Sequence, residues 1–569
     1  MKEAGAYWWA LMFMIRWGLR SCMSCYSLLE LKVGYPYILH SLLNLKGDLS
    51  KFIPIKTPLS GVTGPMAAAS QISHWITECT STDHILCQQS VASPLPTRIL
   101  EILGPAEVRL HTNGQDVPLR ARYACLSHRW GQETFIQTRT SNLKTYESEV
   151  PWAEMPQTFR DAIDVTWRLG LRYLWIDSLC IIQDDQDDWR HEGSKMASTY
   201  SQSYITIAAT AAPGPTGGLF GKTPRDGRAK RIRIEPRDGP RYACYVASVS
   251  ADLLTGARDL PLLNRAWVFQ ERYLSPRVVH FATNEMLWEC KSTVTCECKK
   301  PPRQQDKTNN SFSDFSVLRI LHRSWHNCPQ DPDFKTIDNW HNIVSEYITN
   351  ELTFQLDIFP ALQGIATIMQ RKRQTRYFAG LWEDSLIRDL LWQYVDNGVF
   401  WHPGTAQLRN KAVAYRAPSW SWAARLGAIV WLPVNPDGQP RALVRHIDVS
   451  PVGDNILGAV SMGVLCLEGN CITFESYERM LSEGVDMFHL KDARSLDDDY
   501  IEEGEITLME IFHNPHGGAT WPAMLCMVLK VADEAGHLYK RIGMVRIYYA
   551  KGKSPWHNRV GTVKTLTII

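Results

Sequence analysis

The segment RAWVFQERYL (residues 265–274) holds the pair of residues whose spacing best suits acid–base chemistry. Trp267 and Glu271 stand four positions apart, so a helix places them on one face. A carboxyl group beside an indole is partly shielded from water, which raises its pKa and suits proton transfer or the stabilisation of an oxocarbenium ion. The alternative, which the spacing alone favours, is a surface glutamate that pairs with Arg265 or Arg272.

Polar residues at the ends of short apolar runs form a second candidate group. The runs cover residues 123–127, 173–176 and 204–211. If they are parallel strands, their carboxyl ends meet at one edge of a sheet, where ligands bind in open α/β proteins. Ser127, Arg129, Trp130 and Asp177 then line a pocket with an aromatic surface. The alternative is ordinary loop chemistry, in which Asp177 and Ser127 cap turns and Trp130 covers the core.

Other chemistries lack their motifs. The chain contains neither G-x-x-x-x-G-K-[ST] nor G-x-S-x-G, and the adjacent Ser127 and His128 are poorly placed for a catalytic triad. The acidic run at residues 184–188 fits a helix N-terminus better than a metal site, because carboxylates there cap free N–H groups.

The cysteines do not form a recognisable metal motif. Cys22 and Cys25 have C-x-x-C spacing without a second pair, and Cys290, Cys296 and Cys298 have no standard zinc spacing. For both groups we expect packed or free thiols of an intracellular protein and no metal.

The amino-acid composition is typical of an ordinary globular protein, apart from the many tryptophans. The 569 residues carry a formal net charge of +2, so bulk charge proposes no nucleic-acid partner. The 21 Trp equal the Tyr and outnumber the Phe, and most of them are expected to pack in cores. Residues 4–15 are nearly apolar but too few to span a bilayer, and we expect no firm membrane association.

The elements that position these residues alternate between strands and helices. Residues 98–103 and 107–112 read as strands, and residues 60–75 as a linker before a short helix over residues 73–87. Amphipathic helices are expected at residues 156–169, from residue 184 to 200, and at 264–273, and a further strand at 277–287. This alternation predicts a parallel sheet with helices on both faces.

The chain divides into six expected regions. They are a doubtful apolar extension (1–60), a helix and strands before the core (61–120), an α/β core (121–290), a polar linker (291–315), a mainly helical region (316–410) and an antiparallel β-rich module (411–569). Within the core, the basic stretch at 214–239 is expected to be a solvated hairpin or loop.

Three long motifs closely resemble the fungal heterokaryon-incompatibility (HET) domain. They are YACLSHRWG (123–131), RYLWIDSLCIIQDDQDDWRHEGSKMASTY (172–200) and NRAWVFQERYLS (264–275). The resemblance continues in LPTR (95–98) and in C-terminal segments such as RAPSWSWA (416–423), and covers roughly residues 75–569. It implies a cytoplasmic protein of nonself recognition, in which incompatible fusion triggers programmed cell death through other incompatibility proteins or self-assembly.

The HET domain in turn resembles Toll/interleukin-1 receptor (TIR) domains, which implies a flavodoxin-like sheet. Some TIR domains cleave NAD with the glutamate of a W-x-x-x-E motif, and Trp267 to Glu271 matches that spacing. The resemblance therefore leaves two hypotheses. One is a death-inducing module that acts through assembly and needs no cofactor. The other is a NAD glycohydrolase with Glu271 as the catalytic carboxylate, and with Ser127, Arg129, Trp130, Asp177 and Trp267 around the NAD.

Overall fold

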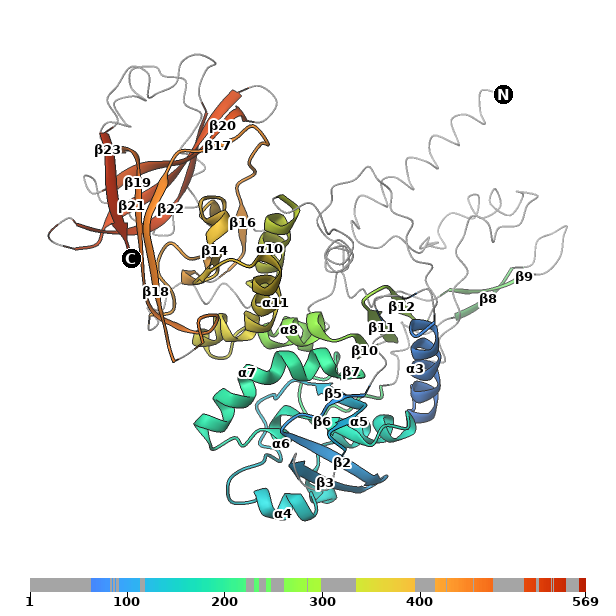
Figure 1. Ribbon diagram of the computed structural model, residues 1–569. Helices are drawn as coiled ribbons and strands as arrows, with labels where there is room; N and C mark the ends of the chain where they lie inside the picture. The colour runs from blue at the N-terminus through green and yellow to red at the C-terminus, as the bar shows by residue number, and fades with distance from the viewer. Residues whose placement is uncertain are drawn as a thin grey trace, which may run out of the picture. The chain divides into compact units, whose positions relative to one another are not determined.

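The computed structural model describes the chain in two compact units, Met1–Cys328 and Pro329–Ile569 (Figure 1). The residues described are 63–81, 84, 87, 92–112, 118–221, 230–234, 242–246, 260–283, 285–297, 334–394, 415–425, 427–453, 455–473, 506–517, 521–533, 535, 537–548 and 562–569. The expected extension at 1–60, with Cys22 and Cys25, lies outside these residues, as do Cys298 and most of the expected polar linker.

A mixed sheet forms the centre of the first unit. Eight of its described strands lie side by side in the order β12-β11-β10-β7-β5-β6-β2-β3. Their bounds are Arg98–Gly104 (β2), Glu107–Thr112 (β3), Tyr123–Ser127 (β5), Tyr173–Trp175 (β6), Ile205–Ala208 (β7), Arg277–Phe281 (β10), Met286–Cys290 (β11) and Val294–Cys296 (β12).

Only the middle of this sheet is parallel. β6, β5, β7 and β10 pair in parallel register, whereas β2–β3 at one edge and β10–β11–β12 at the other pair antiparallel. The expectation of a wholly parallel sheet is therefore wrong at both edges. The single strand expected at residues 277–287 is a hairpin. Connections this short join antiparallel strands, because a parallel pair requires a crossover of a dozen or more residues.

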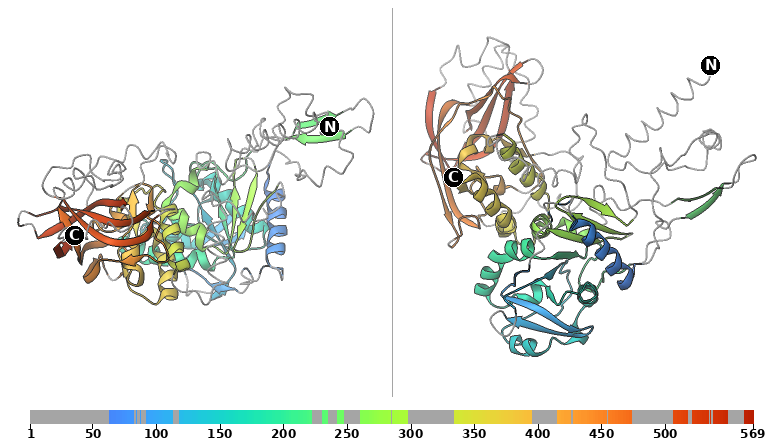
Figure 2. Two further views of the ribbon diagram at one scale, coloured as in Figure 1. Left: turned by 90° about the horizontal axis from the view of Figure 1, so that it is seen from above. Right: turned by 45° about the vertical axis from the view of Figure 1, so that its right-hand side comes forward.

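Helices cover both faces of the sheet, as the strand β5 makes clear. The side chains of Tyr123 and Cys125 both reach the carbonyl oxygen of Thr199 on α7 (Gln186–Gln202), and Ser127 reaches α8 (Ala266–Leu274). Alternate residues of a strand point to opposite faces. The face opposite α7 and α8 is covered by α5 (Gln157–Arg168), whose Phe159, Ala162, Ile163 and Val165 are buried (Figure 2).

The segment before the sheet is a long helix where a linker was expected. α3 spans Pro65–Cys79 and begins with proline at its first turn, where a missing N–H has no cost. Ala68, Ile72, Trp75 and Cys79 recur at helical spacing and are all buried. The alanine run that suggested a linker is thus the start of an amphipathic helix.

The first unit also contains short elements around the sheet. These are α4 (Leu143–Ser148), η3 (Trp152–Glu154), α6 (Asp177–Cys180), η5 (Pro261–Asn264) and the strand pairs β1–β4 (Ser93–Pro94 with Arg120–Ala121) and β8–β9 (Lys230–Ile234 with Tyr242–Val246). β8 lies within the basic stretch 214–239, and β9, which pairs with it antiparallel, follows that stretch.

The second unit combines helices with a large sheet that is antiparallel except for one pairing. Seven of its described strands follow the order β17-β20-β21-β22-β23-β19-β18, with β22–β23 parallel and a further pairing of β19 with β20. The strand bounds are Gln439–Pro440 (β17), Leu443–Pro451 (β18), Val460–Thr473 (β19), Ile506–Gly517 (β20), Trp521–Val531 (β21), Leu538–Tyr548 (β22) and Thr562–Ile568 (β23).

Helices and two small antiparallel strand pairs precede this sheet and contain a core rich in tryptophan. They are α10 (Phe334–Tyr347), η6 (Gln355–Ile358), η7 (Pro360–Leu362), α11 (Gln363–Arg373), β13–β14 (Tyr377–Phe378, Leu381–Trp382), η8 (Glu383–Ser385), α12 (Leu386–Asp389), β15–β16 (Trp392–Tyr394, Ile429–Trp431) and η10 (Trp422–Ala424). Trp340 and Trp422 donate their indole N–H groups to the same carbonyl oxygen, that of Gly380. Five described tryptophans of this unit are fully buried in the core, as expected: Trp340, Trp382, Trp392, Trp420 and Trp422.

Across the described residues, no helix combines the length and the apolar character needed to cross a membrane.

Candidate functional site

Ser127 and Glu271 meet at the carboxyl end of the central strand. Ser127 is the last residue of β5, and its hydroxyl donates a hydrogen bond of 2.6 Å to Oε2 of Glu271 on α8. Both side chains are buried, with exposed fractions of 2% for Ser127 and 6% for Glu271. The structure therefore joins two of the predicted site residues, and Glu271 is not the surface glutamate of the alternative interpretation.

Burial raises the pKa of Glu271 from its ordinary value of 4.5 to about 7. The hydroxyl of Ser127 opposes this rise because its hydrogen bond stabilises the carboxylate, whereas the negative charge of Asp177 adds to the rise. Arg265 and the hydroxyl of Tyr200 also lower the pKa. The net result is a carboxyl group poised to gain or lose a proton near neutral pH, as a general acid or base requires.

Arg272, the other partner in the alternative interpretation, is occupied elsewhere. Its guanidinium forms two hydrogen bonds with the carboxylate of Glu289 on β11, at 2.6 and 3.2 Å. Arg265 acts on the site in a different way, because its Nη1 donates to the backbone carbonyl oxygen of His128 at 2.9 Å. This bond ties the first turn of α8 to the loop that follows β5.

Asp177 and Trp130 form a second pair at the same edge of the sheet. The indole Nε1 of Trp130 donates to Oδ2 of Asp177 at 2.7 Å, and the backbone N–H of Ser178 donates to Oδ1, also at 2.7 Å. Asp177 therefore caps the short helix α6, as the loop interpretation expects, and also positions Trp130. The same contact orients the indole edge-on to Phe135, with ring centroids 5.5 Å apart.

His128 is a further member of this site, although the sequence suggested it only as a poorly placed triad residue beside Ser127. Burial lowers the pKa of its imidazole, so the ring is neutral, and its Nδ1 lies 3.6 Å from Oδ1 of Asp177. Among the described residues neither ring nitrogen has a hydrogen-bond partner. A buried imidazole with unused nitrogens beside a carboxylate is an available proton acceptor or donor. Its position directly after Ser127 was the signal that could have identified it.

Trp267 and Arg129 complete the predicted set. The ring of Trp267 packs edge-on against Trp189 of α7, with centroids 6.4 Å apart, and Arg129 is half-buried in the loop after β5. Trp267 thus lies on the same helix as Glu271, as the i, i+4 spacing predicted, and fastens that helix to α7.

The acidic run 184–188 serves structure, as expected. The carboxylate of Asp185 accepts hydrogen bonds from the N–H groups of Asp187 and Asp188 at 2.9 and 3.1 Å and so caps α7. Asp188 pairs with Arg98 of β2, and Asp184 accepts from Thr140. These contacts account for the acidic cluster without a metal ion.

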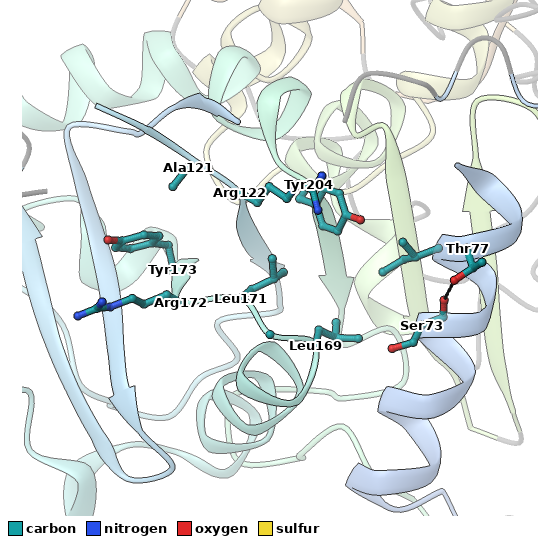
Figure 3. A pocket seen from close by; sticks show the side chains of 11 residues that line it. Ser73, Thr77, Ala121, Arg122, Leu169, Leu171, Arg172, Tyr173 and Tyr204 are labelled. Atoms are coloured by element: carbon teal, nitrogen blue, oxygen red, sulfur yellow. Dashed lines mark hydrogen bonds between the residues drawn. The ribbon is translucent and has the colours of Figure 1, made fainter. Parts of the chain in front are cut away.

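Two hollows of the structure lie away from this site. One of about 460 Å³ is lined by Arg122, Tyr173 and Tyr204, at the amino ends of β5, β6 and β7 (Figure 3). The other, of about 960 Å³, surrounds α4. Neither is lined by Ser127 or Glu271, whose side chains are buried.

Comparison with known proteins identifies the segment that carries this site. Residues 123–271 match the family model described as heterokaryon incompatibility protein (HET). The match begins at the first residue of β5 and ends at Glu271 itself. No curated protein and no solved structure matches the chain. The chain therefore contains a HET domain, and the Ser127–Glu271 pair lies within it.

Proposed function

We propose that this protein acts in nonself recognition between fungal strains. Its HET domain triggers programmed cell death in the cytoplasm by assembling with other incompatibility proteins or with further copies of itself. The match of residues 123–271 to the incompatibility family is the observation that carries this proposal. The burial of Glu271 supports it, because a buried and hydrogen-bonded carboxyl group fits a signalling domain that need not bind a substrate. The small net charge of +2 gives no reason to invoke nucleic acid.

The test couples cell death to assembly. The full chain is expressed from an inducible promoter in a fungal host, and viability is compared with the association state of the purified protein over a wide concentration range. We expect death on induction and concentration-dependent oligomers. A protein that stays monomeric, together with undiminished viability at high expression, contradicts the proposal.

A NAD glycohydrolase is the second candidate, and the Ser127–Glu271 contact favours it. The parallel strands lie in the order β6-β5-β7-β10, which is second, first, third and fourth along the chain. This order is typical of flavodoxin-like sheets and supports the likeness to TIR domains. A carboxyl group with a pKa of about 7 stands at the carboxyl edge of that sheet, where such proteins bind their ligands.

In this reaction the bond between nicotinamide and ribose breaks, and nicotinamide leaves with the bonding electrons. Glu271 stabilises the ribosyl cation or orients the ribose hydroxyls, and water then adds to the anomeric carbon and releases a proton. Ser127, Arg129 and Asp177 hold ribose or phosphate, while Trp130 and Trp267 shape the pocket.

The catalytic candidate is tested by measuring nicotinamide release from NAD at high protein concentration, where assembly is favoured. Glu271→Gln keeps the shape of the side chain and removes its charge, and Glu149→Gln makes the same change at an exposed position. We expect Glu271→Gln to abolish release and Glu149→Gln to leave it intact. If a folded Glu271→Ala protein kills cells as effectively as the parent, the NAD glycohydrolase hypothesis is refuted and the assembly hypothesis remains.

A further inference from the structure

We propose that Cys79, His84, Cys87 and Cys290 bind a zinc ion. One potential ligand atom from each residue takes part, and all four atoms lie within 4.8 Å of one another. Three cysteines and one histidine are a common ligand set for structural zinc. The proposed zinc ligands lie outside the residues that match the HET family, and the proposal does not depend on the function proposed above.

The spacing of the ligand atoms suits tetrahedral coordination. With Zn–S bonds of about 2.3 Å and Zn–N bonds of about 2.0 Å, a tetrahedron separates sulfur from nitrogen by roughly 3.6 Å and two sulfurs by roughly 3.8 Å. The Sγ of Cys290 lies 3.7 Å from Nδ1 of His84. A single ion therefore fits between these two side chains without a change of backbone.

The burial and the reduced state of the three cysteines also suit a zinc site. Cys79, Cys87 and Cys290 are free thiols, and their exposed fractions are between 0% and 4%. His84 is half-buried and closes the remaining side. Three buried thiols around one point leave one unpaired in any disulfide, whereas zinc uses all three.

The neighbours of the cluster stabilise thiolates. The backbone N–H of Thr293 donates to Sγ of Cys290 at 3.3 Å, and the hydroxyl of Ser292 lies 3.5 Å from Sγ of Cys87. Arg277, fully buried, donates to the carbonyl oxygen of Cys87 at 2.6 Å. Zinc with three thiolates carries one net negative charge, so these donors and this cation form the outer shell that such a site requires.

The site links chain segments on either side of the HET match. Cys79 ends α3, His84 and Cys87 follow it, and Cys290 ends β11, so residues 123–271 lie between the first three ligands and the fourth. Trp75 of α3 already packs against Trp288 of β11, with ring centroids 5.9 Å apart. Figures 1 and 2 both draw α3 beside this edge of the sheet. The zinc ion therefore links the end of α3 to the end of β11.

The site could not be recognised from the sequence, because Cys290 is far along the chain from the other three ligand residues. The expectation grouped Cys290 with Cys296 and Cys298, whereas Cys296 is disulfide-bonded and does not belong to the cluster. Cys79 and Cys87 lie in the segment 73–87 that was expected to be a short helix, and nothing in the sequence joins that segment to Cys290.

Zinc analysis of the full chain, purified under reducing conditions, tests the proposal. We expect about one zinc ion per chain, lost in Cys87→Ser and Cys290→Ser and retained in Cys466→Ser, which changes a free thiol of the second unit. Retention of stoichiometric zinc by a folded Cys290→Ser protein overturns the assignment.

Cobalt substitution gives a second readout that does not require a cysteine to be removed. His84→Cys keeps four ligands, so we expect it to bind Co²⁺ with a stronger thiolate charge-transfer band than the parent, whereas His84→Ala weakens binding. A folded, reduced parent protein that contains no zinc and takes up no Co²⁺ refutes the site. So does a disulfide between any two of Cys79, Cys87 and Cys290 in freshly isolated protein, found by mass spectrometry.

Discussion

Replacing Glu271 with glutamine should change how the stability of the HET domain depends on pH. Burial raises the pKa of this carboxyl from 4.5 to about 7 in the folded protein. Because the folded value lies above the unfolded one, folding favours the protonated form. The corresponding stability is complete below about pH 4.5 and is lost as the pH rises through about 7. Glutamine mimics the neutral carboxyl and still accepts the hydrogen bond of Ser127, so the variant should not show this loss.

The size of the effect follows from the two pKa values. One pKa unit corresponds to about 1.4 kcal/mol, so ionising Glu271 costs about 3 kcal/mol more in the folded protein than in the unfolded chain. The side chain is only 6% exposed, so solvent screening reduces this figure little. Between about pH 5.5 and about pH 8.5 the parent should lose about 2 kcal/mol relative to Glu271→Gln.

Urea unfolding followed by tryptophan fluorescence measures this difference, since Trp175 and Trp288 are buried in the same unit. If urea unfolding shows more than one transition, the free energies are compared for the transition that shifts in Glu271→Gln. Glu149→Gln serves as a control for the change of formal charge. The appearance of a protonated carboxyl band in infrared difference spectra, with a midpoint near pH 7, reports the titration directly. Parallel pH profiles for the parent and Glu271→Gln would show that the carboxyl does not titrate in the folded state as its burial requires.

Two further substitutions test packing and capping. Gly380→Ala should destabilise the second unit by about 3 kcal/mol, because Gly380 has φ of +96° and a Cβ there would lie 2.4 Å from Nε1 of Trp422. Gly453→Ala, at φ of +80° with no atom within 4 Å, should cost only about 1 kcal/mol, so equal shifts in the two thermal midpoints contradict the steric argument. Asp185→Ala removes the N-cap of α7 and should lower the free energy of unfolding by about 1 kcal/mol, measured by urea denaturation; an unchanged value contradicts the role of the cap.

The regular elements of the first unit were predictable because their patterns are local. β5 is a run of five buried residues, and α5 has its apolar residues at helical spacing. Each element can therefore be recognised from the residues of that element alone. The antiparallel edges were missed because an apolar run carries no information about the direction of its neighbour. The helix α3 was expected too late in the chain, at 73–87, because the small alanines of its first turns gave a weak apolar signal, although Ala68 and Ala69 are buried.

The contacts of the site were predictable only in part. The helix of Glu271 could be inferred from the i, i+4 spacing, but the hydrogen bond to Ser127 joins residues 144 positions apart. That contact depends on the order of β5, β7 and β10 in the sheet, which places the segment before β10 over the end of β5. The rise in the pKa of Glu271 was expected from the nearby indole, whereas burial of the whole side chain is its main cause.

The helix α8 connects the two candidate functions. It is held at its start by the hydrogen bond from Arg265 to His128, and in its second turn by the bond from Ser127 to Glu271. Glu271 is buried beside these bonds, and its ionisation destabilises the folded state in which they form. An assembly contact that draws α8 away from β5 would expose the carboxyl group, and its pKa would then fall toward the ordinary value, because burial is the main cause of the rise. If catalysis occurs, it should depend on protein concentration and on pH together, and a monomer should be inactive.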